Sequence, residues 1–172
     1  MAEYNTKLQA CNNSLRDILT QINNLPDAES GSGNGDTSIE DALVQKTLTT
    51  YANDRVTTIG SWAFYNQNNL SIISFPKCTS IDSYAFYNCG LQIVQLPVCT
   101  KICSSVFYQC TSLFRIYLLA SSVCTLQNSN AFSNTNIKST SGSIFVPASL
   151  VSAYKSATNW TYFSNRIFSY TG

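Results

Sequence analysis

One pattern recurs between Ile59 and Pro147, and it limits the possible folds of this 172-residue chain more than any other feature. An aliphatic residue is followed five or six residues later by a phenylalanine, four times over. These phenylalanines are Phe64, Phe86, Phe107 and Phe132, separated by 22, 21 and 25 residues. A period of this length is too short for two helices but long enough for one coil of a solenoid. We therefore expect about four stacked coils of 21–25 residues.

Other apolar positions recur in phase with the phenylalanines. Small residues precede them at Ala63, Ala85, Val106 and Ala131, and aliphatic residues follow at Leu70, Leu91, Leu113 and Ile137. Apolar residues then alternate with other residues at Ile73-x-Phe75, Val94-x-Leu96, Ile116-x-Leu118 and Ile144-x-Val146. This alternation is typical of a short strand, and a second extended piece is expected around Ile59 and its equivalents. The repeats predict an α+β chain built on a short right-handed β-solenoid with parallel strands and one continuous core.

Residues 1–27 predict a helix with a heptad pattern. Its seam is apolar at every a and d position: Tyr4, Leu8, Cys11, Leu15, Ile18, Ile22 and Leu25. So narrow a stripe favours self-association, although one amphipathic helix lying on the repeats is the alternative. Leucine at two a positions, with isoleucine at one a and one d position, favours a trimer or tetramer over a dimer. We expect a homo-oligomer, with a trimer favoured.

The remaining segments are assigned from composition and position. Residues 28–37 are rich in Gly and Ser and predict a flexible linker. Residues 38–55 are expected to cap the first coil, because terminal repeats must be covered. The repeats then fill residues 56–147, and residues 148–172 predict a helical C-terminal cap.

The second repeat carries the fullest set of motif residues. They are Ile81, Ala85, Phe86, Cys89, Leu91, Val94, Leu96 and Pro97. This pattern resembles the BspA-type leucine-rich repeat of bacterial surface proteins, over about residues 56–147. Asp82 and Cys103 depart from it at a glycine position, and Leu119 at a proline position. The resemblance implies binding of a ligand or host surface and rarely catalysis, and the short helix, linker and few repeats are similar to small phage tail-associated proteins.

Charge divides the chain into two parts. Residues 1–54 carry three Lys or Arg against eight carboxylates, a net charge of −5, and residues 55–172 carry seven against one, a net charge of +6. The basic second part favours anionic partners such as acidic glycans, but its scattered cations argue against nucleic acid. No signal peptide or membrane-spanning segment is recognised. We expect synthesis in the cytoplasm without membrane insertion, and action on a virion tail or bacterial surface.

The residue types that enzymes use are scarce. There is no histidine, and Asp82 is the only carboxylate side chain after Asp54, so catalytic triads and a paired-carboxylate glycosidase site in the repeats are excluded. No nucleotide-binding fingerprint is found. The seven cysteines form no C-x-x-C pair, and we expect free structural thiols, although stacked cysteines would lie close enough for a disulfide. The sequence predicts no catalytic residue, metal site or cofactor.

Binding is the function that remains. Strand positions that point away from the core, Ile72, Ile93, Gln95, Arg115, Tyr117 and Phe145, are suited to a ligand-binding patch, and Tyr65, Tyr87 and Tyr108 form a second candidate row. The C-terminal cap covering part of the first patch is an equally weighted alternative. For the amides beside the second row (Asn66, Asn88, Gln109 and Asn134), an inward amide ladder that bonds loop backbone is favoured over sugar contacts. The favoured hypothesis is a non-enzymatic adhesion module for a cell-surface glycan or protein, and the alternative is a structural subunit of a tail or surface assembly.

Overall fold

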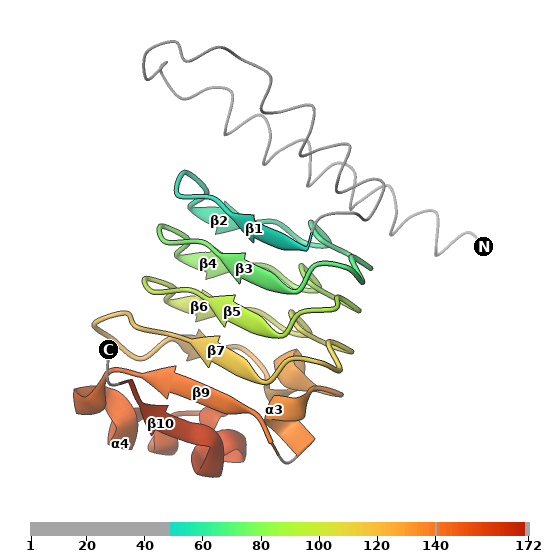
Figure 1. The fold of residues 1–172 in the computed structure, drawn as a ribbon. Coiled ribbons are helices and arrows are strands. Elements are labelled where there is room, and N and C mark those ends of the chain that lie inside the picture. The colour runs from blue at the N-terminus through green and yellow to red at the C-terminus, as the bar shows by residue number, and fades with distance from the viewer. Residues whose placement is uncertain (1–48, 140, 171–172) are drawn as a thin grey trace.

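The computed structural model describes residues 49–139 and 141–170, and these residues form a β-solenoid. The predicted N-terminal helix and its oligomerisation seam, the linker, and most of the predicted N-terminal cap lie outside the described residues. Each coil contributes one strand to a larger sheet. In the first four coils, a two-residue strand of a smaller sheet follows it. Figure 1 shows the strands of successive coils stacked one below another.

The larger sheet has six parallel strands in the order β1-β3-β5-β7-β9-β10. They are β1 (Thr50–Ala52), β3 (Ile72–Ser74), β5 (Ile93–Gln95), β7 (Arg115–Tyr117), β9 (Ser143–Val146) and β10 (Ile167–Ser169). The smaller sheet has four parallel strands: β2 (Thr58–Ile59), β4 (Ser80–Ile81), β6 (Lys101–Ile102) and β8 (Thr125–Leu126). Both predicted strand positions of the coil are therefore confirmed. The predicted caps contribute the two outermost strands of the larger sheet, β1 and β10.

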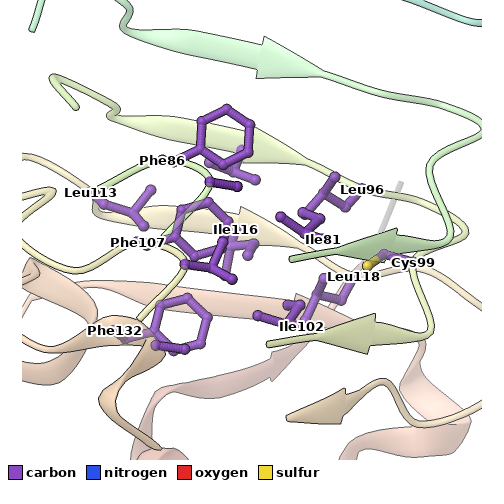
Figure 2. Close-up of a cluster of buried hydrophobic side chains, with 14 of the residues drawn as sticks. Ile81, Phe86, Leu96, Cys99, Ile102, Phe107, Leu113, Ile116, Leu118 and Phe132 are labelled. Carbon is purple, nitrogen blue, oxygen red and sulfur yellow. The ribbon is translucent and has the colours of Figure 1, made fainter. Parts of the chain in front are cut away.

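The core between the two sheets contains the predicted phenylalanine column. Consecutive rings from Phe64 to Phe132 are stacked, with centroids 4.9, 5.6 and 5.5 Å apart and planes within 15° of parallel. All four side chains are at most 1% exposed. Figure 2 shows Phe86, Phe107 and Phe132 one above another, beside the inward residues of both sheets. The central expectation from the sequence is confirmed, because equivalent residues of successive coils form shared rows of the core.

The loops between Phe and the next strand turn through left-handed backbone. Asn66, Asn88, Gln109 and Asn134 have φ between 54° and 62°, a region that asparagine tolerates better than most residues. The Asn88 amide donates a 2.7 Å hydrogen bond to the side-chain oxygen of Asn66. The sequence predicts an inward ladder of these amides that bonds loop backbone. The ladder is confirmed for this pair, although its two amides bond to each other across the coils rather than to loop backbone.

Buried cysteines connect neighbouring coils by a weak hydrogen bond. The Cys89 thiol donates to the carbonyl oxygen of Phe64 at 2.8 Å, and the Cys110 thiol donates to that of Phe86 at 3.0 Å. Each thiol therefore satisfies a carbonyl of the preceding coil while filling a core position. The six cysteines among the described residues are free thiols.

The C-terminal segment closes one end of the core. It contains the 3-10 turns η2 (Ala148–Leu150) and η3 (Trp160–Arg166) and the short helix α4 (Val151–Ser156), whereas η1 (Ser129–Phe132) and α3 (Asn136–Ser139) precede β9 in the last repeat. Trp160 and Phe163 pack against Phe132, the last ring of the column. The Trp160 indole donates to the carbonyl of Cys124 at 2.6 Å, and the Tyr154 hydroxyl accepts from the Cys124 amide. Helical turns thus cover this end of the core, but the segment is not purely helical as predicted, because it returns to the larger sheet as β10.

Candidate functional site

The solvent side of the six-stranded sheet, here called the outer sheet face, holds the first group of predicted binding residues. One of its columns contains Ile72, Ile93, Arg115 and Ser143, and the other contains Ser74, Gln95, Tyr117 and Phe145. Members of a column lie opposite each other in adjacent parallel strands, about 4.8 Å apart. The structure therefore brings all six predicted residues of this group together on one surface.

Arg115 is the single cation within the two columns. Its side chain is exposed, and its guanidinium carbon lies 5.3 Å from the centre of the Phe114 ring. A cation held over an aromatic face keeps its charge while its orientation is restricted. Above it, Ile72 and Ile93 are half-buried. Apolar residues beside one oriented arginine resemble the composition of binding interfaces more than that of ordinary surface.

Aromatic residues gather at the C-terminal end of the outer sheet face. Tyr117 stacks on Phe145, with centroids 5.0 Å apart and planes 16° from parallel. Phe145 contacts Phe168 at 6.4 Å, and Tyr170 stands edge-on to Tyr117 at 5.8 Å and 88°. Phe168 and Tyr170 are 45% and 43% exposed. In the described residues, the C-terminal cap therefore contacts this face at two places, Phe168 against Phe145 and Tyr170 against Tyr117.

A hollow of about 280 Å³ lies beside this aromatic end. We call it the stacking pocket, and it is lined by Ser74, Gln95, Pro97, Tyr117, Leu119 and Tyr170. None of these side chains carries a formal charge. The pocket extends from the six-stranded sheet to the turns that follow β5 and β7.

The second predicted group, Tyr65, Tyr87 and Tyr108, is part of a separate surface row. Their rings stack at 5.5 and 5.3 Å, and Trp62 stacks on Tyr84 at 4.3 Å with nearly parallel planes. These five residues, the loop aromatic row, are half-buried. They lie on loops running from a strand of the smaller sheet to the next strand of the larger one. The two predicted groups therefore lie on different parts of each coil.

Sequence reasoning missed two residues of the outer sheet face, Phe168 and Tyr170. A weak signal was present, because Ile167-Phe168 repeats the Ile144-Phe145 pair that precedes it in the sheet. The tail was assigned to a helical cap, so this pair was not aligned with the strands. No sequence pattern predicts the stacking pocket, because its lining side chains become neighbours only when the coils stack.

Two titratable groups of the core, Cys78 and Tyr154, are held neutral by burial. Burial raises the pKa of the Cys78 thiol to about 12, and it also raises the pKa of the Tyr154 hydroxyl. Neutral thiols of this kind are poor nucleophiles. No group of three potential metal-binding side chains is found in residues 49–139 and 141–170. No helix in the same residues is long and apolar enough to span a membrane.

The family to which these stacked repeats belong follows from a sequence comparison. The model of the BspA type leucine-rich repeat region matches residues 44–171 in six copies. The chain belongs to this family. A comparison with curated proteins found no match.

Membership of the BspA-type family gives the general function. Leucine-rich repeats mediate protein binding, and BspA-type repeats suggest interaction or adhesion modules; the family is typically one of binding or scaffold modules rather than enzymes. The fold itself does not fix the ligand, which depends on the side chains displayed. In this chain, the outer sheet face and the loop aromatic row display the largest groups of exposed or half-buried aromatic residues.

Proposed function

We propose that this chain is a non-enzymatic binding module that recognises a glycan or protein on a cell surface through its outer sheet face. The observation that carries the proposal is the register of the six-stranded sheet. It aligns Ile72, Ile93 and Arg115 beside Tyr117 and Phe145 on adjacent strands.

The energetics of such a face favour binding. Aromatic and arginine side chains contribute most of the affinity in known interfaces, because they bury much area for few immobilised bonds. Parallel strands hold the aromatic side chains of this face in fixed positions, so little side-chain freedom is lost when a partner arrives. The stacked pair Tyr117 and Phe145 is already ordered.

The test compares two variants that each remove one positive charge. Arg115→Ala removes the cation of the outer sheet face, and Lys101→Ala removes an exposed cation from β6, on the other sheet. The full chain and both variants are applied to arrays of glycans and of bacterial surface proteins. We expect Arg115→Ala to weaken binding about tenfold or more, with Lys101→Ala within about twofold of the parent.

Two outcomes would contradict the proposed face. Equal losses in both variants would indicate a general effect of positive charge, and loss in Lys101→Ala alone would place binding on the other sheet. A Tyr117→Ala variant, read on the same arrays, tests the aromatic half of the face independently of charge.

Self-association through residues 1–27 is part of the proposal. Several copies joined by the linker of residues 28–37 would bind a multivalent surface more tightly than one copy does. We propose that this assembly, with a trimer favoured, acts on a virion tail or bacterial surface. Light scattering before and after deletion of residues 1–27 tests it, and an unchanged mass per particle would contradict it.

A structural subunit of a tail or surface assembly is the second candidate. The loop aromatic row supports it, because Tyr65, Tyr87 and Tyr108 stack mainly on one another and serve the fold of successive coils. Silence on every array, together with incorporation of the chain into a particle, would favour this candidate over the binding module.

A further inference from the structure

The aromatic column of the outer sheet face stops abruptly in the middle of the sheet. Reading from the C-terminal end, Phe168, Phe145 and Tyr117 occupy equivalent positions of β10, β9 and β7. The next two equivalent positions, in β5 and β3, hold Gln95 and Ser74. Three aromatic rings are therefore followed by two smaller polar side chains.

This change leaves one face of the Tyr117 ring, here called its open face, without an aromatic partner among the described residues. Phe145 covers the other face, with the two planes only 16° from parallel. The open face points toward β5, where the stacking pocket begins, because Gln95 and Ser74 line that pocket together with Tyr117. Tyr170 forms a second wall at 88° to Tyr117. A ring placed here would extend the stack by one member.

The polar groups around this space have unused hydrogen-bonding capacity. In residues 49–139 and 141–170, the side chains of Ser74 and Gln95 and the hydroxyls of Tyr117 and Tyr170 make no hydrogen bond. Hydroxyls and a primary amide offer both donors and acceptors. A ligand that uses them needs several hydroxyl groups arranged around an apolar ring face.

We propose that the stacking pocket binds one neutral sugar ring, whose C–H face lies on Tyr117 and whose hydroxyls contact Ser74 and Gln95. The inference rests on the proposed function and names the class of ligand at that face. A neutral sugar differs from the acidic glycan that the net charge of +6 on residues 55–172 favours. The six residues that line the pocket carry no charge. An anionic sugar would gain no ion pair from them.

Size and shape favour a single ring over an extended peptide. The volume of about 280 Å³ lies just below the range of pockets that hold drug-sized ligands. A proline-rich peptide is the main competing ligand, since it also docks on aromatic side chains. Proline residues have no N–H group, however, so such a peptide could accept hydrogen bonds from Ser74 and Gln95 through its carbonyls but would donate fewer to their oxygens than sugar hydroxyls do.

The test uses the full chain and small soluble probes. The methyl glycosides of glucose, galactose, mannose and N-acetylglucosamine are titrated, with methyl glucuronide as the charged probe and a proline-rich decapeptide as the competing one. Protein NMR shifts and saturation transfer to the ligand are recorded. We expect at least one neutral glycoside to bind with a Kd of about 1 mM, to shift Gln95 and Tyr117, and to receive saturation at its ring C–H protons.

Gln95→Tyr is the decisive variant, because the new ring would occupy the space above Tyr117 and extend the stack within the protein. Gln95 is exposed, so the fold should tolerate the change. Thr125→Tyr places the same side chain on an exposed position of β8, on the other sheet, and serves as the control. We expect Gln95→Tyr to weaken binding of the glycoside about tenfold or more, and Thr125→Tyr to leave it unchanged.

Each contrary result has a defined meaning. Undiminished glycoside binding in Gln95→Tyr, methyl glucuronide binding as tightly as methyl glucoside, or shifts at the pocket by the peptide alone would overturn the sugar proposal. Absence of detectable binding by every glycoside would also overturn the proposal. If array binding is nevertheless lost in Arg115→Ala, the proposed function stands and only the ligand assigned to the pocket is wrong.

Discussion

Phe107 lies in the interior of the phenylalanine column, between Phe86 and Phe132. Its replacement by alanine tests the packing of the coils. The ring is fully buried and stacks on Phe86 and Phe132 at 5.6 and 5.5 Å. Removing a buried phenylalanine lowers stability by about 3–5 kcal/mol, and the loss of two stacked partners places this site in the upper part of that range. For the ~120 residues that the structure describes, a loss of about 4 kcal/mol lowers Tm by about 16 °C.

The assay is urea unfolding followed by circular dichroism, with Tyr162→Ala as the matched control. Tyr162 is 73% exposed, so its truncation should change the free energy of unfolding by less than about 0.5 kcal/mol. Phe107→Leu retains most of the apolar volume and should lose only about 1–2 kcal/mol. If Phe107→Ala is within about 1 kcal/mol of Tyr162→Ala, the stacked core described here is refuted.

Three further predictions concern single positions. Gly90→Ala should lower the free energy of unfolding, measured in urea, by more than about 2 kcal/mol, because the added Cβ would clash with the backbone oxygen of Asn68. Asn88→Gly should lower it by about 1 kcal/mol, through the lost bond to Asn66, and Asn88→Ala by about 2 kcal/mol, since alanine is also strained at φ 54°; equal losses would contradict the argument from backbone strain. The urea concentration at the midpoint of unfolding should fall as the pH rises from 9 to 12. Folding raises the pKa of Cys78 to about 12, so within this interval only the unfolded chain releases the thiol proton. Cys78→Ala should reduce the fall, and a pH profile identical to that of the parent would contradict this reasoning.

The strands and the core could be predicted because each repeat carries the same information. Alternation at Ile73-x-Phe75 and its equivalents indicates a strand, and the matching positions in other coils fix which residues stack. A single coil would have been ambiguous, since such short apolar runs are also compatible with a buried helix. Repetition at one period removes that ambiguity.

The binding face could be predicted only in part. The columns containing Arg115 and Tyr117 follow from strand alternation alone. The contribution of Phe168 and Tyr170 could not be derived in the same way, because the tail returns to the sheet after a helical segment and shares only two residues with the repeat pattern. The open ring face of Tyr117 depends on Phe145 and Gln95, neighbours that only the stacked coils define.

The backbone conformation of the loops could not be predicted from the sequence either. Left-handed backbone is unusual for aromatic residues, yet Trp62 and Tyr84 have φ of 64° and 63°. Their stacked rings, 4.3 Å apart, accompany this conformation in successive coils. Local preference would have placed glycine or asparagine there, so contacts between the coils override it.

Footprinting by hydroxyl radicals is the most direct test of the outer sheet face as the binding surface. The full chain is oxidised with and without the ligand that the arrays identify, and the labelling of individual aromatic residues is measured. We predict that the ligand suppresses oxidation of Tyr117, Phe145 and Tyr170 and leaves that of Tyr84 and Tyr162 unchanged. Protection of Tyr84 or Tyr162, with Tyr117 still fully labelled, would contradict the account.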